Sequence, residues 1–276
     1  MLSLNSQTTD NTRRIIILNF RQNSMQLIDE LLLELQYMKN EKIELSLMTI
    51  ESELSVPDYD EANLEIKVFQ SNILENDIRK CINLDQIETA VILCDRRKSD
   101  YADYYTILLS KYLTKCNPGI HIIVELQKSE NIKYLGQTKV ADVICIEELS
   151  EKLLSKSSIM HGFSKFYMHL LYNTFDTNSI FSIKMPQSLE GESYRHAEEL
   201  LCDYHQDMIL IGYITKIEDA NGNKREYIII NPEKGKPDSP NGKEYVLKSS
   251  DRLVIIAYEN PNLGEMERQN RILNAA

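Results

Sequence analysis

The sequence predicts an α/β protein with a doubly wound parallel sheet, followed by a long helix and a second, small α+β domain. Short apolar runs alternate with amphipathic segments through residues 13–146, a pattern typical of strands joined by helical crossovers. A helical segment with apolar residues over much of its circumference then covers residues 147–174. Short strand-like runs return after residue 177, so a separate small domain is expected there.

Six apolar runs of strand length occur in the first part of the chain. They are residues 13–18, 43–48, 64–69, 90–94, 120–124 and 142–146. Parallel neighbours need connections of about a dozen residues, usually helical. The predicted helices lie at residues 28–35, 73–83, 101–114 and 129–137. Residues 49–63 are acidic, contain Pro57 and are predicted to form a loop.

The turn after the first strand, residues 19–24, contains no glycine. A Rossmann-like dinucleotide site usually carries G-x-G-x-x-G there, because glycine lets the backbone approach a pyrophosphate. Asn19, Arg21 and Asn23 place side chains in that space instead, although the guanidinium of Arg21 can itself hold an anion. The sequence therefore predicts the Rossmann-like fold while arguing against a high-affinity site for NAD or ATP.

Composition limits the partners and the compartment. The net charge of −11 leaves no basic excess for nucleic acid, and the basic runs at 96–98 and 234–236 are expected to be solvated loop charges. The five cysteines show no C-x-x-C and no metal-ligand spacing, which favours a reducing cytosol. No run approaches the roughly twenty apolar residues of a membrane span, and no signal-peptide core is present. We therefore expect a soluble, cytoplasmic chain.

The helix predicted at residues 147–174 has an apolar stripe wider than one packing face can cover. We expect it to pack on a second copy of the chain. The residues predicted to form this dimer interface are Met160, Phe163, Phe166, Tyr167 and Leu170. The alternative is a terminal helix folded onto its own domain.

Strand-like runs at 179–183, 208–214, 226–230 and 252–258, with a helix at 194–203, predict the small α+β domain. An Asn-Gly pair at 221–222 indicates a turn, and Asn231-Pro232 ends a strand. The predicted organisation is a flexible tail at 1–12, the sheet domain at 13–146, the crossover helix at 147–176, the α+β domain at 177–260 and a tail at 261–276.

Three segments of the small domain carry a family resemblance. They are Ile209-Leu210-Ile211-Gly212-Tyr213, Ile228-Ile229-Ile230-Asn231-Pro232 and Ser250-Asp251-Arg252-Leu253-Val254-Ile255-Ile256-Ala257. They resemble an isoleucine-glycine strand, a strand ending in I-x-N-P and the terminal strand of an RCK (regulator of potassium conductance) domain with its C-terminal subdomain. With the preceding lobe and long helix, the resemblance covers residues 13–258. Within that group the chain is most similar to the cytosolic gating-ring region of Castor/Pollux-type ion channels.

The resemblance implies a cytosolic ligand-sensing domain at the cytosolic face of a membrane, and not an enzyme. RCK domains pair through their crossover helices and assemble, often eight together, into a gating ring that acts on the pore of a potassium or other cation channel. A ligand drives such a ring by binding one geometry more tightly than another. Two alternatives are a stand-alone RCK subunit of a potassium transporter and a nucleotide-dependent oxidoreductase. The absence of G-x-S-x-G, H-E-x-x-H, P-loop and glycine-turn motifs argues against the oxidoreductase.

Calcium-gated RCK domains carry carboxylates after the fourth and fifth strands, and the resemblance places Asp100, Glu125 and Gln127 at these ligand positions. Gln127 stands where a carboxylate is expected, so a calcium site here should be weak. Alternatively, Asp100 caps the helix predicted at 101–114. For a nucleotide, the resemblance retains Glu51 as the acidic residue after the second strand; otherwise Glu51 is a loop carboxylate.

Overall fold

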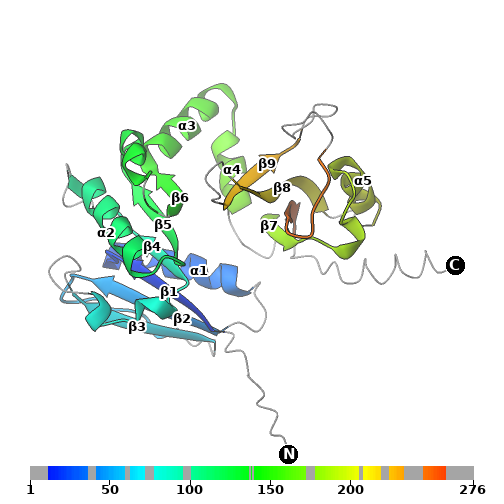
Figure 1. Ribbon diagram of the computed structural model, residues 1–276. Helices are drawn as coiled ribbons and strands as arrows, with labels where there is room; N and C mark the ends of the chain where they lie inside the picture. Colours follow the sequence, from blue (N-terminus) through cyan, green and yellow to red (C-terminus); the bar gives the residue numbers. More distant parts are fainter. Residues whose placement is uncertain are drawn as a thin grey trace, which may run out of the picture. The chain divides into compact units, whose positions relative to one another are not determined.

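The structure is a computed structural model in which the chain forms two compact units, residues 1–164 and 165–276 (Figure 1). The residues described are 12–36, 42–59, 63–71, 78–95, 101–136, 138, 140–171, 178–204, 208–218, 224–232 and 245–258.

The first unit is built on one sheet of six parallel strands in the order β3-β2-β1-β4-β5-β6. These strands are β1 (Thr12–Leu18), β2 (Lys42–Thr49), β3 (Leu64–Gln70), β4 (Thr89–Ile92), β5 (His121–Leu126) and β6 (Val140–Cys145). The strand order reverses between β1 and β4, which confirms the predicted Rossmann-like, doubly wound sheet.

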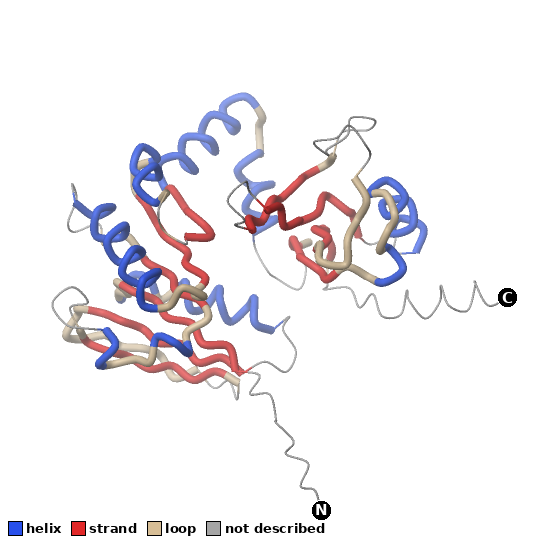
Figure 2. Tube along the Cα trace, in the orientation of Figure 1, coloured by secondary structure: helices blue, strands red, loops and turns tan. Residues whose placement is uncertain are grey.

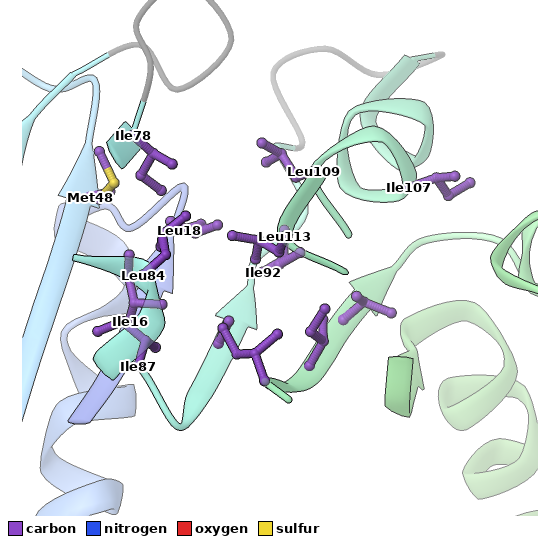
Figure 3. Packing of buried hydrophobic residues seen from close by; sticks show 14 of the residues in the cluster. Ile16, Leu18, Met48, Ile78, Leu84, Ile87, Ile92, Ile107, Leu109 and Leu113 are labelled. Atoms are coloured by element: carbon purple, nitrogen blue, oxygen red, sulfur yellow. The ribbon is translucent and has the colours of Figure 1, made fainter. Parts of the chain in front are cut away.

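Helices α1 (Gln26–Gln36) and α2 (Ala102–Cys116) supply apolar residues to two separate core clusters of the sheet. Successive residues of a strand point to opposite faces. Ile17 of β1 accordingly joins the cluster that contains Ile28 of α1. Ile16 joins the cluster that contains residues of α2 (Figure 3). The central strand is therefore buried on both faces, as its continuous apolar run predicted.

Two predicted helices of the first unit are shorter and tighter than expected. Of the helix predicted at 73–83, residues 73–77 lie outside the described residues, and the rest contains only the 3-10 turn η2 (Ile78–Lys80). The side-chain oxygen of Asn83 then accepts the N–H of Asp85 at 3.3 Å and starts a separate 3-10 turn, η3 (Leu84–Gln86). The helix predicted at 129–137 is the 3-10 helix η5 (Ser129–Leu135).

The prediction of one continuous crossover helix is wrong. The structure has two helices, α3 (Ile146–Ile159) and α4 (Phe163–Leu171), with a short loop between them (Figure 2). The N–H of Met160 still bonds to the carbonyl of Lys156 at 2.8 Å, but Gly162 adopts a φ of +84°. Met160 itself is extended, with φ −109° and ψ 101°, so α3 ends there; the left-handed Gly162, a conformation that costs little at glycine, lies in the loop before α4. Residues 172–174 of the predicted helix lie outside the described residues.

The second unit contains an antiparallel sheet in the order β7-β10-β8-β9 and the helix α5 (Tyr194–Tyr204). Its strands are β7 (Ser179–Lys184), β8 (Met208–Glu218), β9 (Lys224–Ile230) and β10 (Arg252–Ala257). A Cβ at Gly212 would lie 2.2 Å from the carbonyl oxygen of Ile229, so the glycine of the isoleucine-glycine strand allows β9 to approach β8. Asn231, with a φ of 45°, follows the end of β9 as predicted.

Candidate functional site

The turn after β1 is tied to both neighbouring strands without using glycine. Asn19 has a φ of 59°, a left-handed conformation that asparagine adopts more readily than most residues. Its Nδ2 donates a hydrogen bond to the carbonyl of Leu93, just beyond β4, at 2.8 Å. The N–H of Phe20 donates to the carbonyl of Met48 in β2 at 2.9 Å, and the Phe20 side chain is fully buried. These contacts fix the turn where a dinucleotide site would need a flexible glycine loop.

An ion pair spans the point where the strand order reverses. Arg21 follows β1, Asp95 follows β4, and the guanidinium of Arg21 bonds to the carboxylate of Asp95. The Arg21 and Asp95 side chains are only 12% and 6% exposed. Ligands of doubly wound sheets bind in the crevice at this reversal. Here the guanidinium of Arg21 already holds an anion from its own chain.

Glu51 contacts the same turn, but not in the manner of a ribose ligand. Its Oε2 accepts the main-chain N–H of Gln22 at 2.9 Å, and its own N–H donates to Oγ1 of Thr49 at 3.0 Å. The Gln22 side chain in turn exchanges two hydrogen bonds with the backbone of Ser55, at 3.0 and 3.2 Å. Two carboxylates of the protein, Glu51 and Asp95, thus occupy a backbone donor and a guanidinium that could otherwise bind a phosphate.

The fold therefore brings together only some of the residues predicted to bind an anion or a nucleotide. Asn19, Arg21 and Glu51 surround one turn, whereas Asn23 is exposed on the 3-10 turn η1 (Gln22–Ser24). The hydrogen bonds of the first three support the expectation that NAD and ATP bind poorly, which stays a prediction.

The predicted calcium residues lie on or near the end of β5. Oε2 of Glu125 accepts the main-chain N–H of Cys94 at 2.8 Å, which joins the ends of β4 and β5. Gln127 follows β5, while Asp100 lies outside the described residues, so neither its ligand role nor its capping role is tested. Tyr101 occupies the N-cap position of α2. No group of three or more His, Cys, Asp or Glu side chains is placed to hold a metal within the described part of the chain.

Asp103, a buried carboxylate in the first turn of α2, was not predicted from the sequence. Its Oδ1 accepts the N–H of Gln127 at 2.8 Å, and its Oδ2 accepts the N–H of Lys128 at 3.1 Å. Nδ2 of Asn131 also donates to Oδ2, at 2.6 Å. Asp95 was missed as well. Both aspartates lie close to the end of β4, at the sheet edge where such folds gather ligands, and this position was the signal that could have identified them.

The predicted dimer residues lie on a poorly covered pair of helices. No described side chain of α3 or α4 is buried. Met160 and Phe166 are 56% and 57% exposed, whereas Phe163, Tyr167 and Leu170 are half-buried. Ile159, the last residue of α3, is 84% exposed. Both helices therefore expose large apolar side chains to solvent.

Asp251, in the motif that precedes the terminal strand β10, has a structural role in the second unit. The carboxylate of Asp251 is buried, and its Oδ2 accepts hydrogen bonds from the Tyr245 hydroxyl at 2.8 Å and the N–H of Lys248 at 2.9 Å. The Tyr245 hydroxyl also bonds to Thr215 at 2.7 Å. Burial raises the pKa of Tyr245 to about 12. Asp251 thus anchors the segment that enters β10.

A doubly wound six-stranded lobe, a pair of crossover helices and a small α+β subdomain together define the class. The chain has the fold of an RCK domain with its C-terminal subdomain, as the sequence predicted. Among the helices within the described ranges, none is both long and apolar enough to cross a membrane.

Comparisons with known proteins, by sequence and by structure, are consistent with this fold class. No protein-family model matches the chain. The calcium-gated potassium channel TvoK of Thermoplasma volcanium is 24% identical over 195 residues, which are 69% of this chain and 49% of that protein. The human SLO3 gating ring matches with a TM-score of 0.58 at 14% identity, covering 89% of this chain and 44% of that chain. The chain thus spans about half the length of these relatives. The finer resemblance to Castor/Pollux-type channels stays a prediction.

Proposed function

We propose that this chain is a cytosolic ligand-sensing domain that controls a potassium or other cation channel through rearrangement of an RCK assembly. The RCK fold, shared with a gating ring, and the similarity to a calcium-gated potassium channel support this function. Under this proposal the domain works at the cytosolic face of a membrane. It acts on a pore in the same polypeptide or, in the alternative arrangement, on a separate channel or transporter subunit.

The observation that carries the proposal is the apolar surface of α3 and α4. Ile159, Met160 and Phe166 are each more than half exposed, although burying a large apolar side chain is worth roughly 1.5–3 kcal/mol. Two copies that paired through these helices would recover that free energy. Pairing would supply the homodimer from which the ring that the RCK resemblance implies, often of eight domains, is assembled.

For the ligand we propose calcium, bound weakly at the carboxyl ends of β4 and β5 with Glu125 as the principal carboxylate. Asp100 and Gln127 complete the candidate set. Calcium prefers six to eight oxygen ligands, and the neutral amide of Gln127 contributes less than a carboxylate would. The contacts of Arg21 with Asp95, and of Glu51 with Gln22, argue against a nucleotide as the ligand.

A single preparation of the purified chain tests the proposal against the oxidoreductase alternative. Light scattering reports the assembly in the presence and absence of 5 mM calcium (about the millimolar range of weak calcium modules). Absorbance of the denatured supernatant reports co-purified nucleotide. The proposal expects a dimer or larger assembly that responds to calcium, without bound nucleotide. A monomer that carries nucleotide and transfers hydride would contradict it.

A further inference from the structure

The loop between β5 and η5 is held from one side by a single carboxylate. Asp103 accepts hydrogen bonds from the N–H groups of Gln127 and Lys128 and from the Asn131 side chain. Sγ of Cys94 also lies 3.6 Å from Oδ1 of Asp103. Asp103 is 5% exposed. Hydrogen bonds to an ionised acceptor are stronger than those between neutral groups, so this loop is anchored firmly to the start of α2.

The other side of the same loop holds the first crossover helix. The carbonyl of Gln127 accepts the N–H of Glu147 at 3.2 Å and lies 3.5 Å from Sγ of Cys145. Glu147 is the second residue of α3. The first N–H groups of a helix have no partner within the helix, so the Gln127 carbonyl supplies an acceptor that α3 needs. The peptide units of Gln127 thus connect Asp103 to the beginning of α3.

The loop also begins beside a candidate ligand residue. Glu125 lies two residues before Gln127, and its carboxylate accepts the N–H of Cys94 at the end of β4. Cys94 in turn contacts Asp103. A displacement of Glu125 would therefore act on both neighbours of Asp103, the end of β4 and the loop after β5.

We propose that Asp103 is a positioning residue that couples the carboxyl edge of the sheet to the crossover helix α3. The inference rests on the proposed function in that it gives the ligand edge a physical connection to the pairing helices. With Asp103 in place, the loop moves as one body with α2, and the Gln127 carbonyl stays on Glu147. Without Asp103, the loop moves independently, and the first turn of α3 loses its fixed acceptor.

Amide hydrogen exchange on the full chain tests this coupling residue by residue. In Asp103→Asn, one acceptor oxygen remains, and the amide nitrogen faces either the Gln127 N–H or the two donors of Lys128 and Asn131. We expect the Gln127, Lys128 and Glu147 amides to exchange at least about tenfold faster, the change that corresponds to roughly one lost hydrogen bond. The amides of Ile16 and Ile122 in the core should be unchanged. Glu130→Gln, an exposed carboxylate on η5, is the matched control and should change none of these amides.

One result would overturn the proposal: faster exchange at Gln127 and Lys128 with an unchanged Glu147 amide. Asp103 would then hold only its own loop. If Asp103→Asn does not fold, Asn131→Ala is used instead, because it removes one hydrogen-bond donor to Asp103. Faster exchange of both the Gln127 and the Glu147 amides would support the coupling, and faster exchange of Gln127 alone would contradict it. The exchange of the Glu147 amide can be measured whether the chain is a monomer or a dimer. A failure of the proposed pairing is therefore distinguishable from a failure of the coupling through Asp103.

Discussion

The guanidinium of Arg21 and the buried carboxylate of Asp95 form an ion pair between the ends of β1 and β4, 74 residues apart in the sequence. Removing one member of a buried ion pair takes from the other a charged partner that it needs at low exposure, at a cost of about 3 kcal/mol. Arg21→Ala should therefore lower the free energy of unfolding by about this amount in urea titrations. Lys42→Ala, which removes an exposed pair with Glu65, should leave it nearly unchanged. Equal changes in the free energy of unfolding for the two variants would show that the Arg21–Asp95 pair stabilises the fold no more than an exposed pair does.

The same contacts predict the response to nucleotides. Because Arg21 is paired with Asp95 and the Gln22 N–H with Glu51, NAD and ATP should give no saturable heat at micromolar concentration in isothermal titration. Asp95→Asn together with Glu51→Gln removes both internal anions, and this variant should bind ATP more tightly than the parent chain. Micromolar binding by the parent that Arg21→Ala abolishes would mean that these contacts open to admit a ligand.

Calcium at millimolar concentration should raise the melting temperature of the parent chain, and magnesium should raise it less, because magnesium requires a stricter octahedral geometry. Asp100→Asn together with Glu125→Gln should abolish the increase. Since Glu125 also accepts the N–H of Cys94, the double variant will start from a lower melting temperature, so the calcium-induced shift is the quantity to compare. Glu130→Gln is the control. An undiminished shift in the double variant would place the ion elsewhere.

Acid stability should depend on Glu44. The hydrogen bond from Lys67 is the largest cause that lowers the pKa of Glu44 below its usual 4.5; the charges of Lys67 and Arg14 and the Arg14 hydrogen bond add to it, while burial opposes it. The unfolded chain therefore takes up this proton first as the pH falls. The stabilisation is complete above pH 4.5 and is lost as the pH falls through the folded-state pKa. The test compares the urea midpoint of unfolding at pH 6 with that at pH 3.5, which is about one unit below the usual glutamate pKa. The difference between the two midpoints should be smaller in Glu44→Gln than in the parent chain or in Glu88→Gln, a variant at an exposed site. An identical pH dependence in all three would contradict this assignment.

The six strands and the doubly wound class of the sheet were predictable from the sequence, because runs of apolar residues of strand length indicate buried strands. The crossover helix was mispredicted because the apolar stripe continues through Met160 and Phe163, although the chain leaves the helix at Met160 and turns through Gly162. In η2 and η5, apolar residues at helical spacing fill short 3-10 turns, which periodicity alone cannot separate from α-helix.

The candidate site was harder to predict because its contacts join residues far apart in the sequence. Glu51 was named as an acidic ligand residue, yet its acceptor role for the Gln22 N–H depends on how β1 and β2 lie side by side. Asp103 was missed because a carboxylate in the first turn of a helix usually serves that helix. Its donors come from the loop after β5 and from η5 instead, 24 to 28 residues later.

Sedimentation velocity of the parent chain and of Phe166→Glu tests the central claim, that this is a self-associating RCK domain, most directly. Phe166 is 57% exposed, so its replacement disturbs the fold of α4 less than changes at the half-buried Phe163 or Tyr167 would. Ser164→Glu adds the same charge at an exposed position two residues away, on another side of α4, and is the control. We expect the parent and Ser164→Glu to sediment as dimers or larger assemblies, and Phe166→Glu as a monomer. A monomeric parent, or a Phe166→Glu variant with the mass of the parent assembly, would contradict pairing through α3 and α4.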